Sequence, residues 1–356
     1  MSAPIADRSS LRSAGIAAIA LALGFSAILH PAAQDLFQRL AGLLARLAEA
    51  GLSLSTFEVM RNGTELRNAV TGFAVDVTRA CDGHGILICW AAVLLVLPGR
   101  WQARLLAFAA GFVAIQAFNL VRVVVLFAAS PAGSPLFDTL HYFAFPLATS
   151  ALILALAAWR QPHLRWPAVL AVAALCVAAP VWFFLSGPLG AALLVPAANA
   201  VLAMTAPPEI GSIALRAAGW TVSSDLIQTT QPLRLYLAPL YPGDFALALP
   251  ALAAAGLIAR RGLGLALIGL AAMPVALALA GIGAIWDIAA AHAPVLAAVP
   301  AGDGLVRAEA FAPPPDALRS GLKLAQNVIV HFNLLVLPVL ILQRGASGDA
   351  RPSALD

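Results

Sequence analysis

Long apolar runs separated by short polar breaks dominate this chain. A membrane-spanning helix needs about 20 mostly apolar residues, each rising about 1.5 Å along the axis. Eight segments reach or approach that length, and the second and sixth are the shortest. They are residues 13–31, 84–99, 103–129, 140–159, 166–187, 244–259, 263–286 and 322–343. The pattern predicts an all-α integral membrane protein, a polytopic helical bundle with about eight transmembrane helices.

Arginines gather in alternate loops between the apolar segments. Arginine and lysine in short loops mark the cytoplasmic side of a membrane protein. The loop arginines are Arg8, Arg12, Arg100, Arg104, Arg160, Arg165, Arg260, Arg261, Arg344 and Arg351. We therefore expect both termini in the cytoplasm of a bacterial cell, with a multi-pass chain in the inner membrane. Four longer connections, residues 32–83, 130–139, 188–243 and 287–321, are then expected to face the periplasm or exterior.

The first outer connection carries two patterns of its own. In residues 34–50, five leucines mark one helical face, which predicts an interfacial amphipathic helix or a lid. These are Leu36, Leu40, Leu43, Leu44 and Leu47. Residues 57–60 and 70–77 flank an Asn62-Gly63 turn signal, and the second run alternates with a period of two. That combination predicts a small extracytoplasmic β-hairpin.

The break at residues 160–165 divides the chain into two predicted modules. Residues 1–162 form the first, which contains the candidate chemistry. Residues 163–356 form an accessory membrane module of four helices, with an extracytoplasmic segment at 188–243. Within that segment, residues 220–228 mix polar and apolar positions as a strand does.

Composition narrows the function classes. Hydrophobic residues make up 61% of the chain and charged residues 11%, against about 25% charged in a soluble domain. The net charge of +4 comes from dispersed arginines, and Lys323 is the only lysine. A nucleic-acid-binding face would need clustered basic residues, so we exclude it. Three cysteines in this spacing match neither a disulfide framework nor a zinc site, and we expect no metal or cofactor.

Cys81 is the candidate nucleophile. It opens the run Cys-Asp-Gly-His-Gly, between the predicted strand and the outer end of the second apolar segment. A thiol at a helix N-terminus meets free backbone N–H groups and the positive end of the helix dipole, which favour the thiolate. A buried apolar role is the alternative for any free cysteine. Cys89 and Cys176 lie among apolar neighbours, where that alternative is stronger.

Arg122 is the second candidate, because it lies about 10 Å below the outer end of its apolar segment. An arginine at that depth costs several kcal/mol (roughly 3 or more) unless it is paired or wetted, so it marks a functional cavity unless it snorkels to the interface. Asn119 lies one turn earlier on the same face and is expected to orient Arg122 or the substrate, or to bond a neighbouring helix.

His141 opens the next apolar segment, and it joins Cys81 and Arg122 near the outer face. These three groups suit acyl transfer by a thiol: Cys81 attacks a peptide carbonyl, His141 shuttles protons and Arg122 stabilises the oxyanion. His84 is a second choice of base. Asp82 and His84 are otherwise expected to orient the substrate.

The ordered set of Cys81, the run Asn-Leu-Val-Arg at 119–122 and His141 resembles the exosortase/archaeosortase family of membrane cysteine transpeptidases. The runs around residues 77–84, 98–104 and 115–122 are closest to the exosortase H branch. The resemblance implies cleavage of C-terminal sorting signals, each a short motif, a transmembrane helix and a basic tail, on secreted proteins. Residues 165–344 are similar, more weakly, to an exosortase H-associated membrane protein, which implies a fusion with that partner. Membrane lipid is the other expected partner.

Three other functions remain open from the residues. A transporter would also place Arg122 and Asn119 in a substrate pathway, although no inverted repeat is detected. A non-catalytic envelope assembly or export subunit would use the same polar groups as fasteners between helices. A thiol-redox protein would need Cys81 and Cys89 to approach each other, which eight residues of helix prevent.

Overall fold

The computed structural model describes residues 8–77, 83–129, 135–205, 210–216, 219–228, 235–240, 243–292, 294–300 and 306–347. Its chain forms two compact units. Unit 1 contains residues 1–175, 251–266 and 331–356, and unit 2 contains residues 176–250 and 267–330. Each unit is described by itself. The proposed modules 1–162 and 163–356 concern function and stay a prediction.

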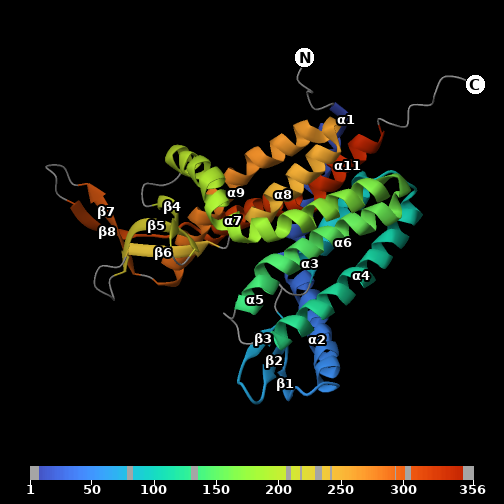
Figure 1. Cartoon of the computed structure of the whole chain (residues 1–356). Helices are drawn as coiled ribbons and strands as arrows, with labels where there is room; N and C mark the ends of the chain where they lie inside the picture. The colour runs from blue at the N-terminus through green and yellow to red at the C-terminus, as the bar shows by residue number, and fades with distance from the viewer. Residues whose placement is uncertain are drawn as a thin grey trace, which may run out of the picture. The chain divides into compact units, whose positions relative to one another are not determined.

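Helices make up most of both units (Figure 1). They are α1 (Arg8–Ile28), α2 (Pro31–Ser53), α3 (His84–Val96), α4 (Trp101–Ala128), α5 (Pro135–Thr139), η1 (Leu140–Ala144), α6 (Phe145–Arg160), η2 (Pro162–Leu164), α7 (Arg165–Thr205), α8 (Gly243–Ile258), η3 (Arg260–Gly262), α9 (Leu263–Ala291), α10 (Asp316–His331), η4 (Phe332–Val336) and α11 (Leu337–Ser347). The strands are β1 (Val59–Asn62), β2 (Glu65–Asn68), β3 (Ala74–Asp76), β4 (Ile210–Arg216), β5 (Gly219–Gln228), β6 (Leu235–Leu240), β7 (Val295–Pro300) and β8 (Val306–Phe311).

The helical membrane architecture is confirmed, but the number of spans is not. Helix occupies most of each of the eight predicted apolar ranges. Among the described residues, five helical stretches are long and apolar enough to cross a membrane: Leu11–Ile28, Trp101–Ala128, Pro135–Arg160, Arg260–Ala291 and Asp316–Gly345. The predicted spans at 84–99 and 244–259 are short helices, because α3 ends at Val96 and the apolar part of α8 is Leu247–Ile258. Apolar composition predicted them as helices, and their length argues against a full crossing.

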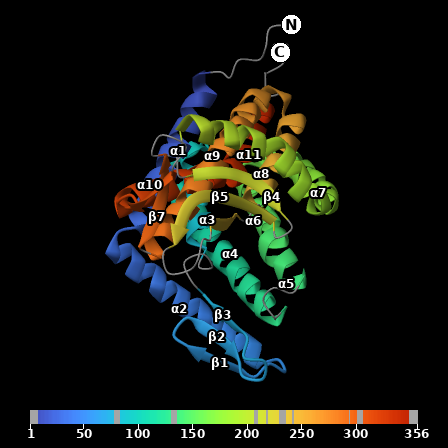
Figure 2. The same cartoon turned by 90° about the vertical axis from the view of Figure 1, so that its left-hand side faces the viewer.

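The predicted hairpin is part of a three-stranded antiparallel sheet. Asn62 pairs with Glu65, so Gly63 and Thr64 form the two-residue turn, and Gly63 has the positive φ of +62° that such a turn requires. The partner strand was predicted wrongly, since β2 follows the turn at once and β3 then pairs with β2. Figure 2 shows the three strands beside α2.

The helix α2 covers the predicted amphipathic segment, but its leucine face is divided. Its buried residues are Ala41, Leu44, Ala45, Ala48 and Leu52, which form a small core with Leu66 of the sheet and with Val123 and Phe127 of α4. The exposed leucines are Leu36, Leu43 and Leu47. Alanines dominate the buried face because they let the sheet and α4 approach the helix backbone closely.

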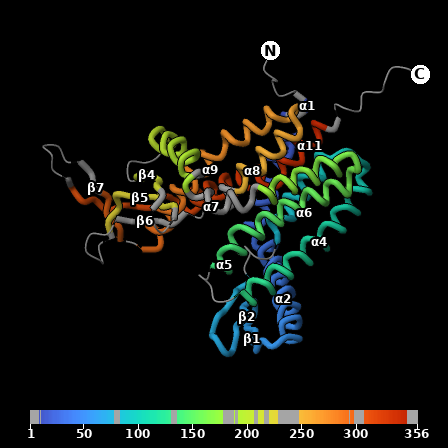
Figure 3. The backbone as a smooth tube through the Cα atoms, viewed as in Figure 1, coloured from blue at the N-terminus to red at the C-terminus, as the bar shows by residue number. Residues whose placement is uncertain are grey.

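Close helix packing sets the position of α4 in unit 1. The fully buried Trp90 of α3 donates its indole N–H to the carbonyl of Ala107 at 3.1 Å. A Cβ atom on Gly111 would lie 2.1 Å from the Trp90 Nε1 atom, so only glycine leaves room for the ring. After α4, the chain continues through α5 and η1 into α6. The helices α4 and α6 lie side by side (Figures 1 and 3).

The end of the chain also belongs to unit 1. Its η4 turn packs against α1, α3 and α6, and α11 packs against α1 and η3. A Cβ atom on Gly262 would lie 2.6 Å from the Ile341 Cγ2 atom, which shows how closely η3 approaches α11. The chain therefore returns to the first helices after passing through unit 2.

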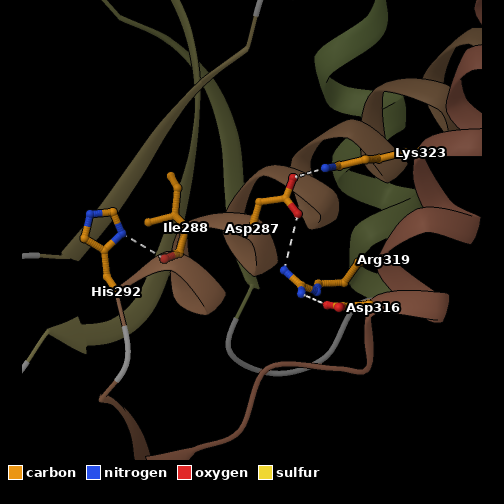
Figure 4. Close-up of polar contacts among 6 residues, drawn as sticks. All are labelled: Asp287, Ile288, His292, Asp316, Arg319 and Lys323. Carbon is orange, nitrogen blue, oxygen red and sulfur yellow. Dashed lines mark hydrogen bonds and ion pairs between the residues drawn. The ribbon is translucent and has the colours of Figure 1, made fainter. Parts of the chain in front are cut away.

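Unit 2 combines helices with a five-stranded sheet of order β4-β5-β7-β8, in which β6 also pairs with β5. The predicted strand at 220–228 is confirmed as β5, which is the central strand. The side-chain amide of Asn199 on α7 donates to the Ile213 carbonyl at 3.0 Å and accepts from the Ile213 N–H at 2.9 Å. Asp287 of α9 pairs with Arg319 and Lys323 of α10 (Figure 4). Sequence analysis did not predict β7 and β8.

Candidate functional site

The candidate site is described from the start of α3, because Cys81 lies just before it in sequence. Cys81 and Asp82 lie outside the described residues, and the description resumes at Gly83. Gly83 is the N-cap of α3 and has a left-handed backbone, with φ +78° and ψ +5°. Glycine adopts this conformation without strain, and it contributes no side chain to cap the first-turn N–H groups. The predicted helix start just after Cys81 is therefore confirmed, with α3 beginning at His84.

Polar side chains of α4 lie directly against this helix start. A Cβ atom on Gly83 would be 3.4 Å from the Gln116 Nε2 atom and 3.6 Å from the Asn119 Nδ2 atom. Asn119 is completely buried. Asn119 thus lies beside Gly83, two residues after Cys81, and its expected role in orienting Arg122 or the substrate stays a prediction. Gln116 was missed, although its spacing of three from Asn119 on an apolar helix was a signal.

Arg122 continues this polar stripe by one further turn of α4. Its side chain is half-buried, and its Nε atom is buried with no hydrogen-bond partner among the described residues. A guanidinium keeps its charge and carries only donors, so a buried donor of this kind costs free energy until an acceptor arrives. A carbonyl oxygen that develops negative charge would be such an acceptor.

His141 lies in an unusual turn of the helix that follows. The N–H of Phe145 bonds to the carbonyl of Leu140, five residues earlier, which defines the π-helical turn η1. The imidazole stacks on Phe137 with ring centroids 5.5 Å apart and meets Tyr142 edge-on at 4.6 Å. Such turns are rare and frequently occur at functional sites.

Arg122 and His141 lie at the same end of one helix pair. The helices α4 and α6 meet through Phe118 and Phe145, whose ring centroids are 6.0 Å apart. Arg122 comes one turn after Phe118, and His141 comes one turn before Phe145. Because the chain reverses between α4 and α6, both residues lie one turn beyond this contact in the same direction.

His84, the alternative base, turns towards another element. Its ring lies 5.4 Å from that of Phe37 on α2. A second imidazole, that of His331, approaches the same first turn of α3: a Cβ atom on Gly85 would lie 3.3 Å from its Nε2 atom. Nothing local in the sequence connects His331 with α3.

The remaining cysteines and possible metal ligands contribute little. Cys89 is fully buried and Cys176 is exposed. Burial of Cys89 within α3 gives no support to a redox pair with Cys81. Across the described parts of the chain, no group of three or more histidine, cysteine, aspartate or glutamate side chains could hold a metal ion.

Comparison with known proteins identifies the region that contains these residues. Residues 8–144 match the family model of the transmembrane exosortase. The match covers Cys81, Asn119, Arg122 and His141, and it ends before unit 2 begins. No curated protein and no solved structure matches the chain. The N-terminal region of this chain, residues 8–144, is therefore similar to the transmembrane exosortase family.

Proposed function

We propose that this protein is a membrane-embedded cysteine protease or transpeptidase that cleaves C-terminal sorting signals of secreted proteins at the extracytoplasmic face. The family whose model residues 8–144 match processes sorting signals in membranes. The observation that carries the proposal is the polar stripe of α4, whose Asn119 lies against Gly83. That contact supports a site in which α4 serves the segment beginning at Cys81.

In the proposed reaction, the Cys81 thiolate attacks the carbonyl carbon of the scissile peptide bond. Arg122 binds the oxyanion of the tetrahedral intermediate, and its buried Nε donor suits that task. As the C–N bond breaks, His141 gives its proton to the leaving amine, and a thioester remains on Cys81. Water or an acceptor amine then attacks the thioester carbonyl and gives up a proton to His141. The C–S bond breaks, which restores the Cys81 thiolate and the protonated His141.

Asn119, Asp82 and His84 are proposed to orient the substrate. Asn119 is buried and adjacent to Gly83, so its amide can fix the position of Arg122 or of the bound peptide. His84 is next to Gly83 in sequence and stays the second choice of base. The orientation of the site towards the periplasm rests on the distribution of loop arginines.

The test uses Cys81→Ala, with Cys89→Ala as the matched control. Each variant is expressed with a tagged secreted reporter that ends in a short motif, a transmembrane helix and a basic tail. We expect C81A to abolish processing, because it removes the nucleophile, and C89A to retain it. Processing is measured by the change in reporter mass, and a thioester to Cys81 is sought by mass spectrometry.

The competing functions predict other results. A transporter or an assembly subunit would leave the reporter unprocessed by the parent protein and would give C81A no phenotype. Equal loss in C81A and C89A would indicate a structural role for both thiols and would count against the mechanism.

A further inference from the structure

The C-terminal segment brings a histidine to the first turn of α3. The distances from a Cβ atom on Gly85 would be 3.3 Å to the His331 Nε2 atom and 3.6 Å to its Cδ2 atom. The first distance is tighter than ordinary van der Waals contact and the second is within it, so the ring edge lies next to the backbone of this turn. Glycine at position 85 is what permits the approach. The same ring packs against Phe25 of α1, with centroids 5.1 Å apart.

The helix that contains His331 is distorted at this point. The N–H of Leu337 bonds to the carbonyl of Phe332, five residues earlier, so the π-helical turn η4 begins directly after His331. This turn packs against α3 and α6. Among the described residues, His141 lies in the second π-helical turn, η1. Each π-helical turn therefore contains or directly follows a histidine, and such turns are often retained where a side chain must be aimed.

We propose that His331 is a positioning residue of the candidate site, which holds the first turn of α3 in place. This inference rests on the proposed function. The first turn of a helix presents free N–H groups and the positive end of the dipole, and both favour a thiolate only if they are correctly aimed. His331 acts on this turn at Gly85, and the chain enters the turn from Cys81, four residues earlier.

The proposal explains why the chain returns to unit 1 after unit 2. The family match ends at residue 144, whereas His331 comes from the part of the chain beyond it. The C-terminal segment 331–356 nevertheless belongs to unit 1. The site is therefore assembled from both ends of the chain, and the matched region alone lacks this imidazole.

The experiment measures the reactivity of Cys81 in the full chain. Cys89→Ala and Cys176→Ala leave Cys81 as the only thiol, and the probe is iodoacetamide, applied from about pH 6 to about pH 9. In this background we compare His331→Ala, His331→Gln and Gly85→Ala. The matched controls are Gly321→Ala on α10, where an added Cβ meets nothing within 4 Å, and His292→Ala in unit 2.

We expect H331A to slow alkylation at about pH 7 by about fivefold and to move the pH profile to higher pH. H331Q should restore the rate to within about twofold, because glutamine can place an amide nitrogen near the position of Nε2. G85A should slow alkylation in the same direction, since its methyl group displaces the ring. G321A and H292A should match the parent.

Two outcomes would overturn the inference. Parent-like alkylation in both H331A and G85A would show that the contact does not position the turn. Equal slowing by H331A and H331Q would show that a nitrogen near the position of Nε2 does not hold the turn in place. Should H331A fail to accumulate, G85A against G321A decides by the same criterion, with equal rates overturning the inference.

Alkylation needs no substrate, which separates this inference from the proposed function. A protein that processes the reporter but shows unchanged alkylation in H331A and G85A refutes only the role of His331. A parent protein that never processes the reporter refutes the proposed function, whatever the alkylation rates are.

Discussion

Two arginines of this protein, Arg319 in unit 2 and Arg122 in unit 1, differ in their ion-pair partners. In unit 2, Asp287 pairs with the Lys323 Nζ atom at 2.6 Å and with the Arg319 Nη1 atom at 3.5 Å, and Arg319 also pairs with Asp316 (Figure 4). In unit 1, Arg122 has no ion pair with any described residue. Its Nε atom, like that of Arg319, is buried without a hydrogen-bond partner among the described residues, so the two arginines differ in their ion pairs.

We propose that Arg319 has a structural role and Arg122 a functional one. Arg319 and its carboxylates compensate one another, so the cluster costs little and joins α9 to α10. An arginine without such compensation in a membrane protein lowers stability, and a chain retains it where another task requires it. We therefore interpret Arg122 as held ready for a negative charge that forms during the reaction.

The largest effect is expected from Arg122→Gln. Loss of an oxyanion-stabilising group should lower the rate of reporter processing by about 100-fold to 1,000-fold. Arg319→Gln is the matched variant in unit 2 and should leave the rate within about threefold, because its partners are carboxylates of the same unit. If the two variants process the reporter at equal rates, the proposed difference in role between Arg122 and Arg319 is wrong.

The next effect tests the close packing of α4 against α3. Gly111→Ala should destabilise the protein by about 1–3 kcal/mol, because its methyl group would overlap the Trp90 ring. The thermal midpoint in detergent measures the loss. Gly42→Ala on α2 is the control, since its added Cβ meets nothing within 4 Å. A midpoint for G111A at or above that of G42A would contradict the packing described.

A smaller effect is expected from Asn119→Leu, which keeps the branched shape of the buried side chain but removes its amide. Processing should fall by roughly 10-fold, as expected for the loss of one buried hydrogen-bonding group. The amount of folded protein should stay near that of the parent, which chromatography in detergent can check. A parent-like processing rate would remove Asn119 from the site.

The smallest effect is expected from Asp287→Asn. Its carboxylate is partly exposed, so losing the pairs with Arg319 and Lys323 should cost only about 0.2–1 kcal/mol. High salt should reduce the difference from the parent, because it screens exposed ion pairs. A loss of processing comparable to that of R122Q would show that the unit 2 cluster is functional after all.

Local patterns predicted much of the fold and part of the site. The Asn62-Gly63 signal located the hairpin turn, and the apolar runs located the helices. The stripe of Asn119 and Arg122 was recognisable because polar groups on a membrane helix cost free energy and therefore often mark a functional site. The five-stranded sheet was mostly missed, because β7 and β8 pair through contacts that short-range alternation does not report.

Periodicity also predicted an apolar face on α2 without saying what would cover it. The face divides into alanines and leucines packed on the sheet and α4, and leucines such as Leu43 that stay exposed. A membrane protein has apolar residues towards both its core and its lipid, so hydrophobicity alone cannot separate the two.

The sequence by itself determined where the helices lie, which residues have reactive chemistry, and that residues 8–144 match the transmembrane exosortase family model. Only the tertiary structure decided that Gln116 and Asn119 lie against Gly83, and that His331 reaches Gly85 from the far end of the chain. The physical reason is range. Helix formation depends on neighbours within a few residues, whereas side chains meet across helices only after the whole unit has packed.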